Sequence, residues 1–256
     1  MMRSKWDQRI RRADELAGEH PFAAEVLRFY GHVTRLQKKL YAGMAGVGAD
    51  LSLLLPLFPD FLEQIAAFAP EPVAQCARDL KKREPAHWLD ALDSFWRVAP
   101  QFQPEPGRAA ELLACVFLQP YAEYLADHRE PIPDGETSGA CPFCSARPVA
   151  GILRPEGDGG KRSLVCSLCA TEWNIGRMWC PACGEQNVEK LAVYTADQFA
   201  HVRVEACDTC RYYIKTVDLT KNGHAMPAVD ELATIPLNFW AQQNGYVKLR
   251  TNLLGI

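Results

Sequence analysis

Apolar residues in the first 130 positions recur at helical spacing. Pro21 suits the first turn of a helix, and apolar side chains follow it at intervals of one, three or four residues as far as Leu40. Glycines then break the pattern, and later apolar stretches each begin at or beside a proline. The pattern predicts an all-α helical domain over residues 1–130, with further helices at Asp60–Ala69, Pro72–Lys82, Pro85–Val98 and Pro106–His128.

The helical domain carries no pattern typical of a catalytic site. A stripe of large apolar residues from Trp88 to Trp96 is expected to form bundle core. Cys76 and Cys115 fall on predicted helices and are interpreted as small core residues rather than ligands or nucleophiles. Pro120 is expected to kink or end its helix, because proline removes a backbone hydrogen bond.

Residues 131–140 interrupt the helical pattern. They combine prolines, glycines and small polar residues without apolar periodicity, which is typical of a linker between domains. Beyond the linker, short strand-like runs replace the helical spacing. Four strands are predicted, at Val149–Leu153, Arg162–Val165, Leu191–Tyr194 and His201–Glu205. The first two are expected to pair as a hairpin across a turn at 156–160, and the last two as a second hairpin.

The chain is therefore predicted to be a multidomain α+β protein. The helical domain precedes two tandem β modules at 141–176 and 177–220, and a helical tail at 221–256 closes the chain. A helix at Ala228–Gln243 is expected in the tail, interrupted by Pro236.

Eight of the ten cysteines lie in the two β modules, in four Cys-x-x-Cys pairs. Each pair places two sulfurs on one tight turn, and two turns supply the four sulfurs of a tetrahedral metal site. The gaps between pairs are long, short and long, and only a long gap leaves room for a hairpin. Sequential pairing is favoured over crossed pairing, giving one site from Cys141, Cys144, Cys166 and Cys169 and a second from Cys180, Cys183, Cys207 and Cys210.

Disulfides and a redox dithiol explain these cysteines less well. The first 20 residues lack the apolar core of a secretory signal, so the chain is expected in the reducing cytosol. A thioredoxin-like dithiol needs one such motif at the start of a helix, not four in tandem. His201 and His224 are near the cysteines, but eight sulfurs already complete two sites, so neither is expected to be a ligand.

Charge and hydropathy argue against two further classes, membrane proteins and nucleic-acid-binding proteins, and the second stays as a weaker hypothesis. The formal net charge is -3, and residues 141–220 carry nine basic and nine acidic side chains. Two tetrathiolate sites add negative charge, whereas nucleic-acid binding needs a basic face, so no nucleic-acid partner is expected. The longest apolar stretch, Leu51–Phe58, is far shorter than the roughly 20 residues of a membrane span, so no stable membrane insertion is expected.

Together these motifs resemble the formate dehydrogenase accessory protein family, FdhE. The resemblance rests on Cys-Pro-Phe-Cys followed by Arg-Pro-Val, on Cys-x-x-Cys-Ala-Thr-Glu-Trp, on Cys-Pro-Ala-Cys, and on the last pair followed by Tyr213-x-Lys215. It continues through Asp230 to Thr234 and covers about 120 residues. Ser145 stands in place of an expected glycine and Asn174 in place of an expected histidine, and the amino-terminal segment is short.

The resemblance implies a cytoplasmic assembly factor rather than an enzyme with turnover. Such a factor binds the catalytic subunit of respiratory formate dehydrogenase and supports its redox maturation before twin-arginine export. The resemblance also favours iron in two rubredoxin-like sites, with zinc as the alternative, since four sulfurs accept either metal. A structural zinc-ribbon scaffold and a rubredoxin-like electron-transfer protein are the other hypotheses, and a homodimer is compatible with all three.

Overall fold

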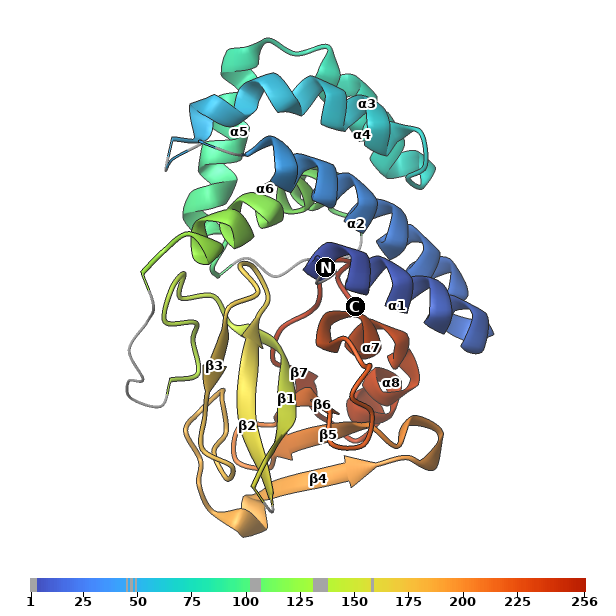
Figure 1. The fold of residues 1–256 in the computed structure, drawn as a ribbon, viewed down its shortest axis with the longest axis vertical. Helices are drawn as coiled ribbons and strands as arrows, with labels where there is room; N and C mark the ends of the chain where they lie inside the picture. The colour runs from blue at the N-terminus through green and yellow to red at the C-terminus, as the bar shows by residue number, and fades with distance from the viewer. Residues whose placement is uncertain are drawn as a thin grey trace.

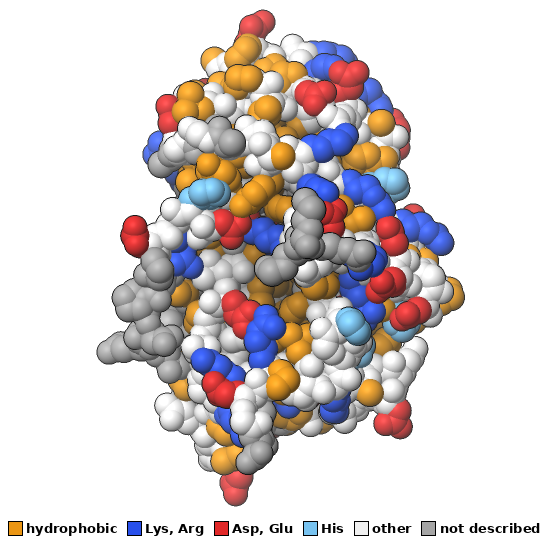
Figure 2. Space-filling view, in the orientation of Figure 1, with side chains coloured by type: hydrophobic (Ala, Val, Ile, Leu, Met, Phe, Trp, Pro, Cys, Tyr) orange, Lys and Arg blue, Asp and Glu red, His pale blue; other side chains and the backbone are white. Residues whose placement is uncertain are grey.

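A computed structural model describes residues 4–44, 46, 48, 50–101, 107–130, 138–157 and 159–256. Figure 1 shows the amino-terminal helices as a layer above a twisted sheet, with two short carboxy-terminal helices between them. The α+β class predicted from the sequence is confirmed. In the space-filling view, charged side chains of both signs are interspersed with apolar ones over this face (Figure 2).

Helices α1 (Lys5–Glu19) and α2 (Ala24–Gly43) pack along each other and form the lower edge of the helical layer (Figure 1). The Ser4 side chain caps α1 by accepting a hydrogen bond from the Asp7 backbone N–H. The predicted helix from Pro21 is present as α2, preceded by a short 3₁₀ turn. Helix α1 was not predicted, because its buried face combines Trp6 and Leu16 with two alanines and the charged Arg12, which is a weak apolar pattern.

Four further helices complete the described part of this layer: α3 (Phe58–Ala66), α4 (Glu71–Lys81), α5 (Pro85–Val98) and α6 (Ala109–Asp127). They confirm the four predicted helices to within a few residues, although Pro106 lies outside the described part of the chain. A 3₁₀ helix at Leu51–Leu57 precedes α3 and was not predicted. Helix α6 continues through Pro120 to Asp127, so of the two predicted effects this proline does not end the helix, and a kink stays a prediction.

The helical core is aromatic at its centre. The Phe117 ring of α6 lies 4.8 Å from the Phe58 ring and 5.1 Å from the Phe61 ring of α3, measured between centroids. Trp88, with the rest of its predicted stripe, packs into the same cluster. Cys115 is buried in this core and Cys76 packs against it, as expected for small apolar residues.

The carboxy-terminal half forms one seven-stranded sheet rather than two isolated hairpins. Its strand order is β3-β2-β1-β6-β5-β4, with β7 also paired to β6. The strands are β1 (Pro148–Glu156), β2 (Gly159–Cys166), β3 (Glu172–Asn174), β4 (Leu191–Thr195), β5 (Val202–Cys207), β6 (Tyr212–Asp218) and β7 (Val247–Lys248). The predicted hairpins are present as the antiparallel pairs β1–β2 and β4–β5, and residue 158 of the first turn lies outside the described residues.

A parallel pairing of β1 with β6 joins the two hairpins. Gly151 pairs with Thr216 and Leu153 with Asp218 in this register. A side chain at position 151 would meet Thr216, since an added Cβ would lie 2.3 Å from the Thr216 Oγ1 atom. Glycine therefore lets the two ribbons approach closely enough to share a sheet. The boundaries at 141–176 and 177–220 remain a prediction, as does the linker, whose residues 131–137 lie outside the described part.

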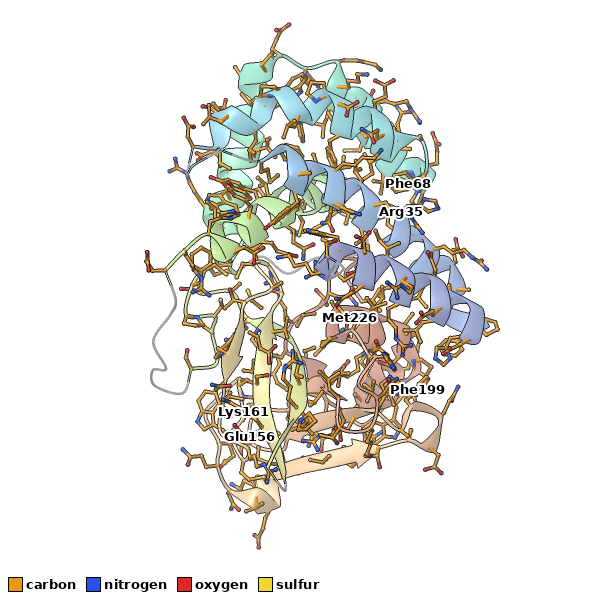
Figure 3. All side chains as sticks on the ribbon, in the orientation of Figure 1. Arg35, Phe68, Glu156, Lys161, Phe199 and Met226 are labelled. Atoms are coloured by element: carbon orange, nitrogen blue, oxygen red, sulfur yellow. The ribbon has the colours of Figure 1, made fainter. Side chains whose placement is uncertain are left out.

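Helices α7 (Pro227–Ala233) and α8 (Ile235–Gln243) follow the last long strand. They break at Thr234, next to Pro236, as the sequence predicted. Helix α7 contacts α1 above it and strands β1 and β6 of the sheet. Phe199, labelled in Figure 3, adds a second contact between the layers, with its ring edge-on to those of His20 and Phe22.

Buried charges anchor α7 between the layers. The Asp230 carboxylate accepts hydrogen bonds from Arg12 of α1 at 2.6 Å and lies 2.7 Å from the ring nitrogen of His201. The neighbouring Glu231 pairs with Lys215 of β6 at 3.0 Å and with Lys248 of β7. Among the described helices, none is both long and apolar enough to cross a membrane.

Candidate metal centres

The four Cys-x-x-Cys turns lie at strand ends, where the backbone must reverse. Cys166 is the last residue of β2, and Cys207 is the last residue of β5. The turns that begin at Cys141 and Cys180 precede the first strand of each hairpin. Each hairpin therefore folds one cysteine turn over the other, which is the arrangement that the long gaps predicted.

Cys141, Cys144, Cys166 and Cys169 form the first cluster. Their sulfurs all lie within 4.8 Å of one another. The sulfur–sulfur distances include 3.6 Å for Cys141–Cys169, 3.4 Å for Cys144–Cys166 and 3.5 Å for Cys144–Cys169. A tetrahedral metal with bonds of about 2.3 Å to sulfur sets the sulfurs about 3.8 Å apart, whereas a disulfide holds them at about 2.05 Å. The cluster therefore fits a metal ion and not a disulfide.

Cys180, Cys183, Cys207 and Cys210 form the second cluster with the same geometry. The Cys180 and Cys210 sulfurs lie 3.7 Å apart, and so do the sulfurs of Cys183 and Cys207. The structure thus groups all eight cysteines sequentially, and the crossed alternative does not occur. All ten cysteines of the chain are free of disulfides.

Backbone N–H groups point at the sulfurs inside the turns. Phe143 and Ala182 donate to the first sulfur of their turns, Cys141 and Cys180, each at 3.4 Å. Leu168 and Cys169 donate in the same way to Cys166, also at 3.4 Å. These dipoles favour the thiolate form, which is the form that binds a metal.

One left-handed residue closes each turn. It directly follows the second cysteine in all four cases: Ser145 (φ 61°), Ala170 (φ 55°), Gly184 (φ 79°) and Arg211 (φ 62°). This conformation turns the chain so that the residue's N–H can reach the carbonyl oxygen of the first cysteine, as Ser145 does to Cys141 at 2.9 Å. The glycine expected at position 145 thus corresponds to a real backbone requirement, which serine meets at a cost.

The clustered thiols oppose one another's ionisation. Hydrogen bonds with the other three thiols lower the pKa of Cys141, and contacts within the same cluster raise the pKa of Cys166 and Cys169. A first thiolate therefore forms readily, while further thiolates in so small a volume need a cation to offset their charge. This chemistry suits a divalent or trivalent metal held by four sulfurs.

The two clusters differ in their surroundings. Cys141, Cys166 and Cys169 are buried in the same apolar cluster as the helical core. From α6, the Gln119 side chain donates to the Ser167 carbonyl oxygen at 3.1 Å, inside the second turn of that site. In the second cluster, by contrast, Cys183 is exposed and Cys210 is half-buried.

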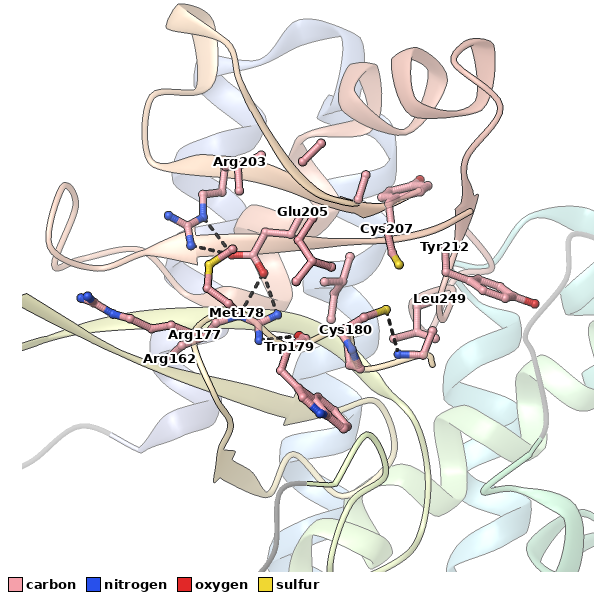
Figure 4. Close-up of a pocket in the computed structure, with 18 residues that line it drawn as sticks. Arg162, Arg177, Met178, Trp179, Cys180, Arg203, Glu205, Cys207, Tyr212 and Leu249 are labelled. Atoms are coloured by element: carbon pink, nitrogen blue, oxygen red, sulfur yellow. Dashed lines mark hydrogen bonds and ion pairs between the residues drawn. The ribbon is translucent and has the colours of Figure 1, made fainter. Parts of the chain in front are cut away.

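A small pocket adjoins the second cluster (Figure 4). Its cavity volume is about 70 Å³, and Cys180 and Cys207 contribute to its wall. Glu205 lies within it between two arginines, 2.7 Å from an Arg162 nitrogen and 2.6 Å from an Arg203 nitrogen. Arg162 also donates to the carbonyl oxygens of Gly176 and Trp179, which fixes the segment that leads into Cys180. These bonds therefore hold the lining of the pocket in place beside the second cluster.

The two histidines that lie near the cysteines in the sequence are not part of either cluster. The ring nitrogen of His201 contacts Asp230, and His224 belongs to neither cluster. Two neighbours of the first cluster were missed from the sequence: Thr171, whose hydroxyl lies 3.1 Å from the Cys169 sulfur, and the buried Arg250. Thr171 could have been noticed from its place two residues after Cys169, whereas nothing local marks Arg250.

The family models that match this chain and a similar crystal structure carry the same family name, FdhE. Residues 140–177 match the family described as FdhE, central domain, and residues 178–254 match FdhE, C-terminal domain. The crystal structure of the FdhE protein from Pseudomonas aeruginosa is similar, with a TM-score of 0.77 and 27% sequence identity over 97% of this chain and 95% of that one.

Curated relatives named as FdhE homologues align over much of the chain. The one from Aquifex aeolicus is 32% identical over 54% of this chain and 50% of its own length. Those from Pseudomonas aeruginosa and Haemophilus influenzae are 29% and 32% identical over 86% and 75% of this chain, and 74% and 64% of their own length. The matched segments thus span between half and three quarters of these relatives.

Proposed function

Because the chain belongs to the FdhE family, we propose that it is an accessory factor for respiratory formate dehydrogenase. In this proposal it binds the catalytic subunit in the cytoplasm, supports its redox maturation before twin-arginine export, and does not itself turn over a substrate. The observation that carries the proposal is the pair of four-sulfur clusters, held in one sheet and alike in geometry but unlike in exposure.

Iron is the metal we propose for the clusters. Eight cysteine sulfurs, four to each cluster, would hold it, and the backbone N–H groups of the turns would stabilise the thiolates. Tetrahedral iron coordinated by four thiolates supplies one-electron chemistry, and hydrogen bonds to the sulfurs and solvent exposure tune its potential. The protein's own contribution is to keep the sulfurs in place while a partner approaches.

The second cluster is the one that a partner can reach. Cys183 is exposed at its rim, and Met178 and Tyr212 beside the adjoining pocket are exposed as well. Apolar side chains around a polar centre suit a transient protein contact. We therefore assign contact with the catalytic subunit to this end of the sheet.

A structural role in which zinc serves as scaffold is the second candidate, and one observation favours it for the first cluster. That cluster is continuous with the helical core, and Gln119 of α6 bonds directly to one of its turns. A metal there would tie the helical layer to the sheet whatever its redox properties. Under this alternative zinc fills both clusters and the protein acts only as an interaction scaffold.

Elemental analysis of anaerobically purified protein, with a visible spectrum of the same sample, tests the metal. About two iron per chain and a red charge-transfer spectrum are expected from two rubredoxin-like sites. Two zinc per chain with no colour would contradict the iron proposal and favour the scaffold. Reversible bleaching on reduction would further separate a redox role from a structural one.

A pulldown tests the partner. Tagged protein from cells growing anaerobically on nitrate and formate is expected to recover the formate dehydrogenase catalytic subunit, and Cys183→Ser is expected to recover less. Cys76→Ser is the matched control, since Cys76 belongs to neither cluster. No recovery by the wild type, together with active enzyme in a deletion strain, would refute the proposal.

A further inference from the structure

A cavity of about 720 Å³ lies between the two clusters. Ser145 and Arg147 line it from the first cysteine turn of the first cluster, and Cys183 and Gly184 line it from the first turn of the second. Arg250, two residues after β7, forms another part of its wall. A molecule that filled this cavity would contact Cys183 of the second cluster and residues that follow the first cysteine turn of the first cluster.

Arg250 is the unusual member of the wall. Only 5% of its surface is exposed, and within the described part of the chain its side chain has one hydrogen bond, from Nη2 to the Ala99 carbonyl oxygen at 3.3 Å. Its buried Nε atom has no hydrogen-bond partner. Burial lowers the pKa of Arg250, although a guanidinium keeps its charge at physiological pH. A buried cation with an unused donor is costly unless an anion accompanies it.

No protein carboxylate among the described lining residues fills that role. The described wall contains neither Asp nor Glu, and its only charged side chains are Arg147 and Arg250. Arg147 is exposed, forms no hydrogen bond or ion pair with a described side chain, and repels the Arg250 charge. Two positive charges therefore face one cavity without a carboxylate between them.

The sulfurs of the first cluster do not account for this arrangement. Cys166 and Cys144 attract the Arg250 charge through space. An arginine that served only as their counter-charge would donate N–H groups to sulfur, but the hydrogen bonds at these described sulfurs come from backbone N–H groups and other side chains of the turns. The Nε donor is left for another acceptor.

We propose that Arg147 and Arg250 form a binding site for an oxyanion, a carboxylate or phosphate group, in the cavity between the two centres. Planar guanidinium groups bind both kinds of oxyanion through paired N–H donors. The oxyanion belongs either to a free small molecule or to an acidic side chain of a bound protein segment. The proposal goes beyond the accessory function and holds whichever metal fills the clusters.

Calorimetric titration of the metal-loaded full chain tests the site, with inorganic phosphate as one probe and a short glutamate-rich peptide as the other. Saturable one-to-one binding is expected, weakened at least tenfold in Arg147→Gln and in Arg250→Met. Arg177→Gln is the matched control and is expected to stay within twofold of wild type. Arg177 lines the neighbouring pocket, and within the described part of the chain its side chain donates to the Gly160 carbonyl oxygen alone.

The outcomes separate the alternatives. Tighter binding of the peptide, displaced by phosphate, assigns the oxyanion to a protein carboxylate, and tighter binding of phosphate assigns it to a free oxyanion. Absence of saturable binding by both probes overturns the proposal, as does unchanged binding in Arg147→Gln. Because Arg147 is exposed, that variant decides the question even where Arg250→Met fails to fold. Lower metal content in Arg147→Gln with unchanged phosphate binding would assign the arginine to the metal centre and also overturn the proposal.

Discussion

Four residues in the left-handed region show how the cysteine turns are closed, and only one of them is glycine. Ser145 at φ 61° has an exposed side chain, so serine gains little there. Ser145→Gly is expected to stabilise the metal-loaded protein by about 0.5–1 kcal/mol, because relief of left-handed strain exceeds the added flexibility of the unfolded chain. The midpoint of urea unfolding measures the gain.

Two comparisons check that this gain comes from backbone strain. Ala146→Gly, at a buried neighbouring position that is not left-handed, is expected to destabilise the protein. Arg211→Gly is also expected to lose stability, because the Arg211 guanidinium stacks over the Tyr246 ring at 4.0 Å. A destabilised Ser145→Gly variant would show that the serine side chain has a role of its own.

The exposure of Cys183 predicts unequal effects of cysteine loss. Cys183→Ser is expected to remove one of two metals and leave the helical layer folded. Cys141→Ser is expected to lower the thermal midpoint by about 10 °C or more, because a buried centre worth several kcal/mol is lost and each kcal/mol shifts the midpoint by about 2–4 °C in a chain of this size. Metal content and thermal unfolding of both variants measure the difference.

Chelator kinetics provide an independent check on the two cysteine variants. Wild-type protein is expected to release one metal quickly, from the exposed cluster, and the other slowly. Cys183→Ser should lose the fast phase, whereas Cys76→Ser should keep both phases. Release of both metals at one rate would contradict the assignment of different roles to the two clusters.

At the scale of residues, the sequence predicted which eight cysteines gather into the two clusters, because Cys-x-x-Cys spacing is a local property of one turn. It did not predict Arg250, which follows Cys166 by more than eighty positions and reaches the first cluster only through the sheet. Nor did it show that Cys183 is exposed while Cys141 is buried. The position of Arg250 and the exposure of these two cysteines both depend on which face of each cysteine turn the helical layer covers.

At the scale of elements, helices were predicted correctly where apolar spacing was dense, and hairpins were predicted correctly where a turn separated two apolar runs. It missed β6, although this strand is almost wholly buried. Residues 212–218 include a buried lysine and a buried aspartate, so they show no apolar alternation. Lys215 is tolerated there because Glu231 and Thr234 of the carboxy-terminal helices satisfy its ammonium group.

The junction between β1 and β6 depends on one glycine. Gly151→Ala would bring a Cβ atom to 2.3 Å from the Thr216 Oγ1 atom, so the Thr216 side chain or one of the two strands must shift. A loss of about 1–3 kcal/mol in the free energy of unfolding is expected, as for overpacking in a core. Urea unfolding of the metal-loaded variant measures the loss.

A double-mutant cycle identifies the cause of that loss. Thr216→Ala removes the hydroxyl and methyl groups that the new Cβ would meet, so adding it to Gly151→Ala is expected to restore part of the stability. The Thr216 hydroxyl has no hydrogen-bond partner, so little polar bonding is lost with it. Strictly additive losses would mean that the two residues do not clash.

At the scale of the whole molecule, Asp230 connects the helical layer to the sheet. It is almost fully buried and binds both Arg12 and His201. Asp230→Asn is expected to cost about 3–5 kcal/mol at pH 7, because the Arg12 guanidinium loses its buried carboxylate partner and keeps only the exposed Glu15, 3.5 Å away. Equilibrium unfolding of wild type and variant at that pH gives the difference.

The difference in the free energy of unfolding between wild type and Asp230→Asn should depend on pH. Burial alone would raise the pKa of Asp230, but hydrogen bonds from His201 and Arg12 lower it below its ordinary value. The carboxylate therefore contributes stability that is complete above the unfolded pKa of about 3.9 and is lost as pH falls through the lower folded pKa. The gap between wild type and Asp230→Asn should be constant above about pH 5 and shrink below about pH 3.9. A gap that stays constant down to pH 2.5 would rule out this linkage.

The parallel pairing of β1 with β6 also affects how the protein is made. At synthesis rates of about 5–20 residues per second, Thr216 leaves the ribosome seconds after its partner Gly151. During that interval the first four cysteines are complete, while the inner edge of their ribbon has no neighbouring strand. The order of the chain thus lets the first cluster capture its metal ahead of the second, and the nascent ribbon must avoid other chains until its own β6 arrives.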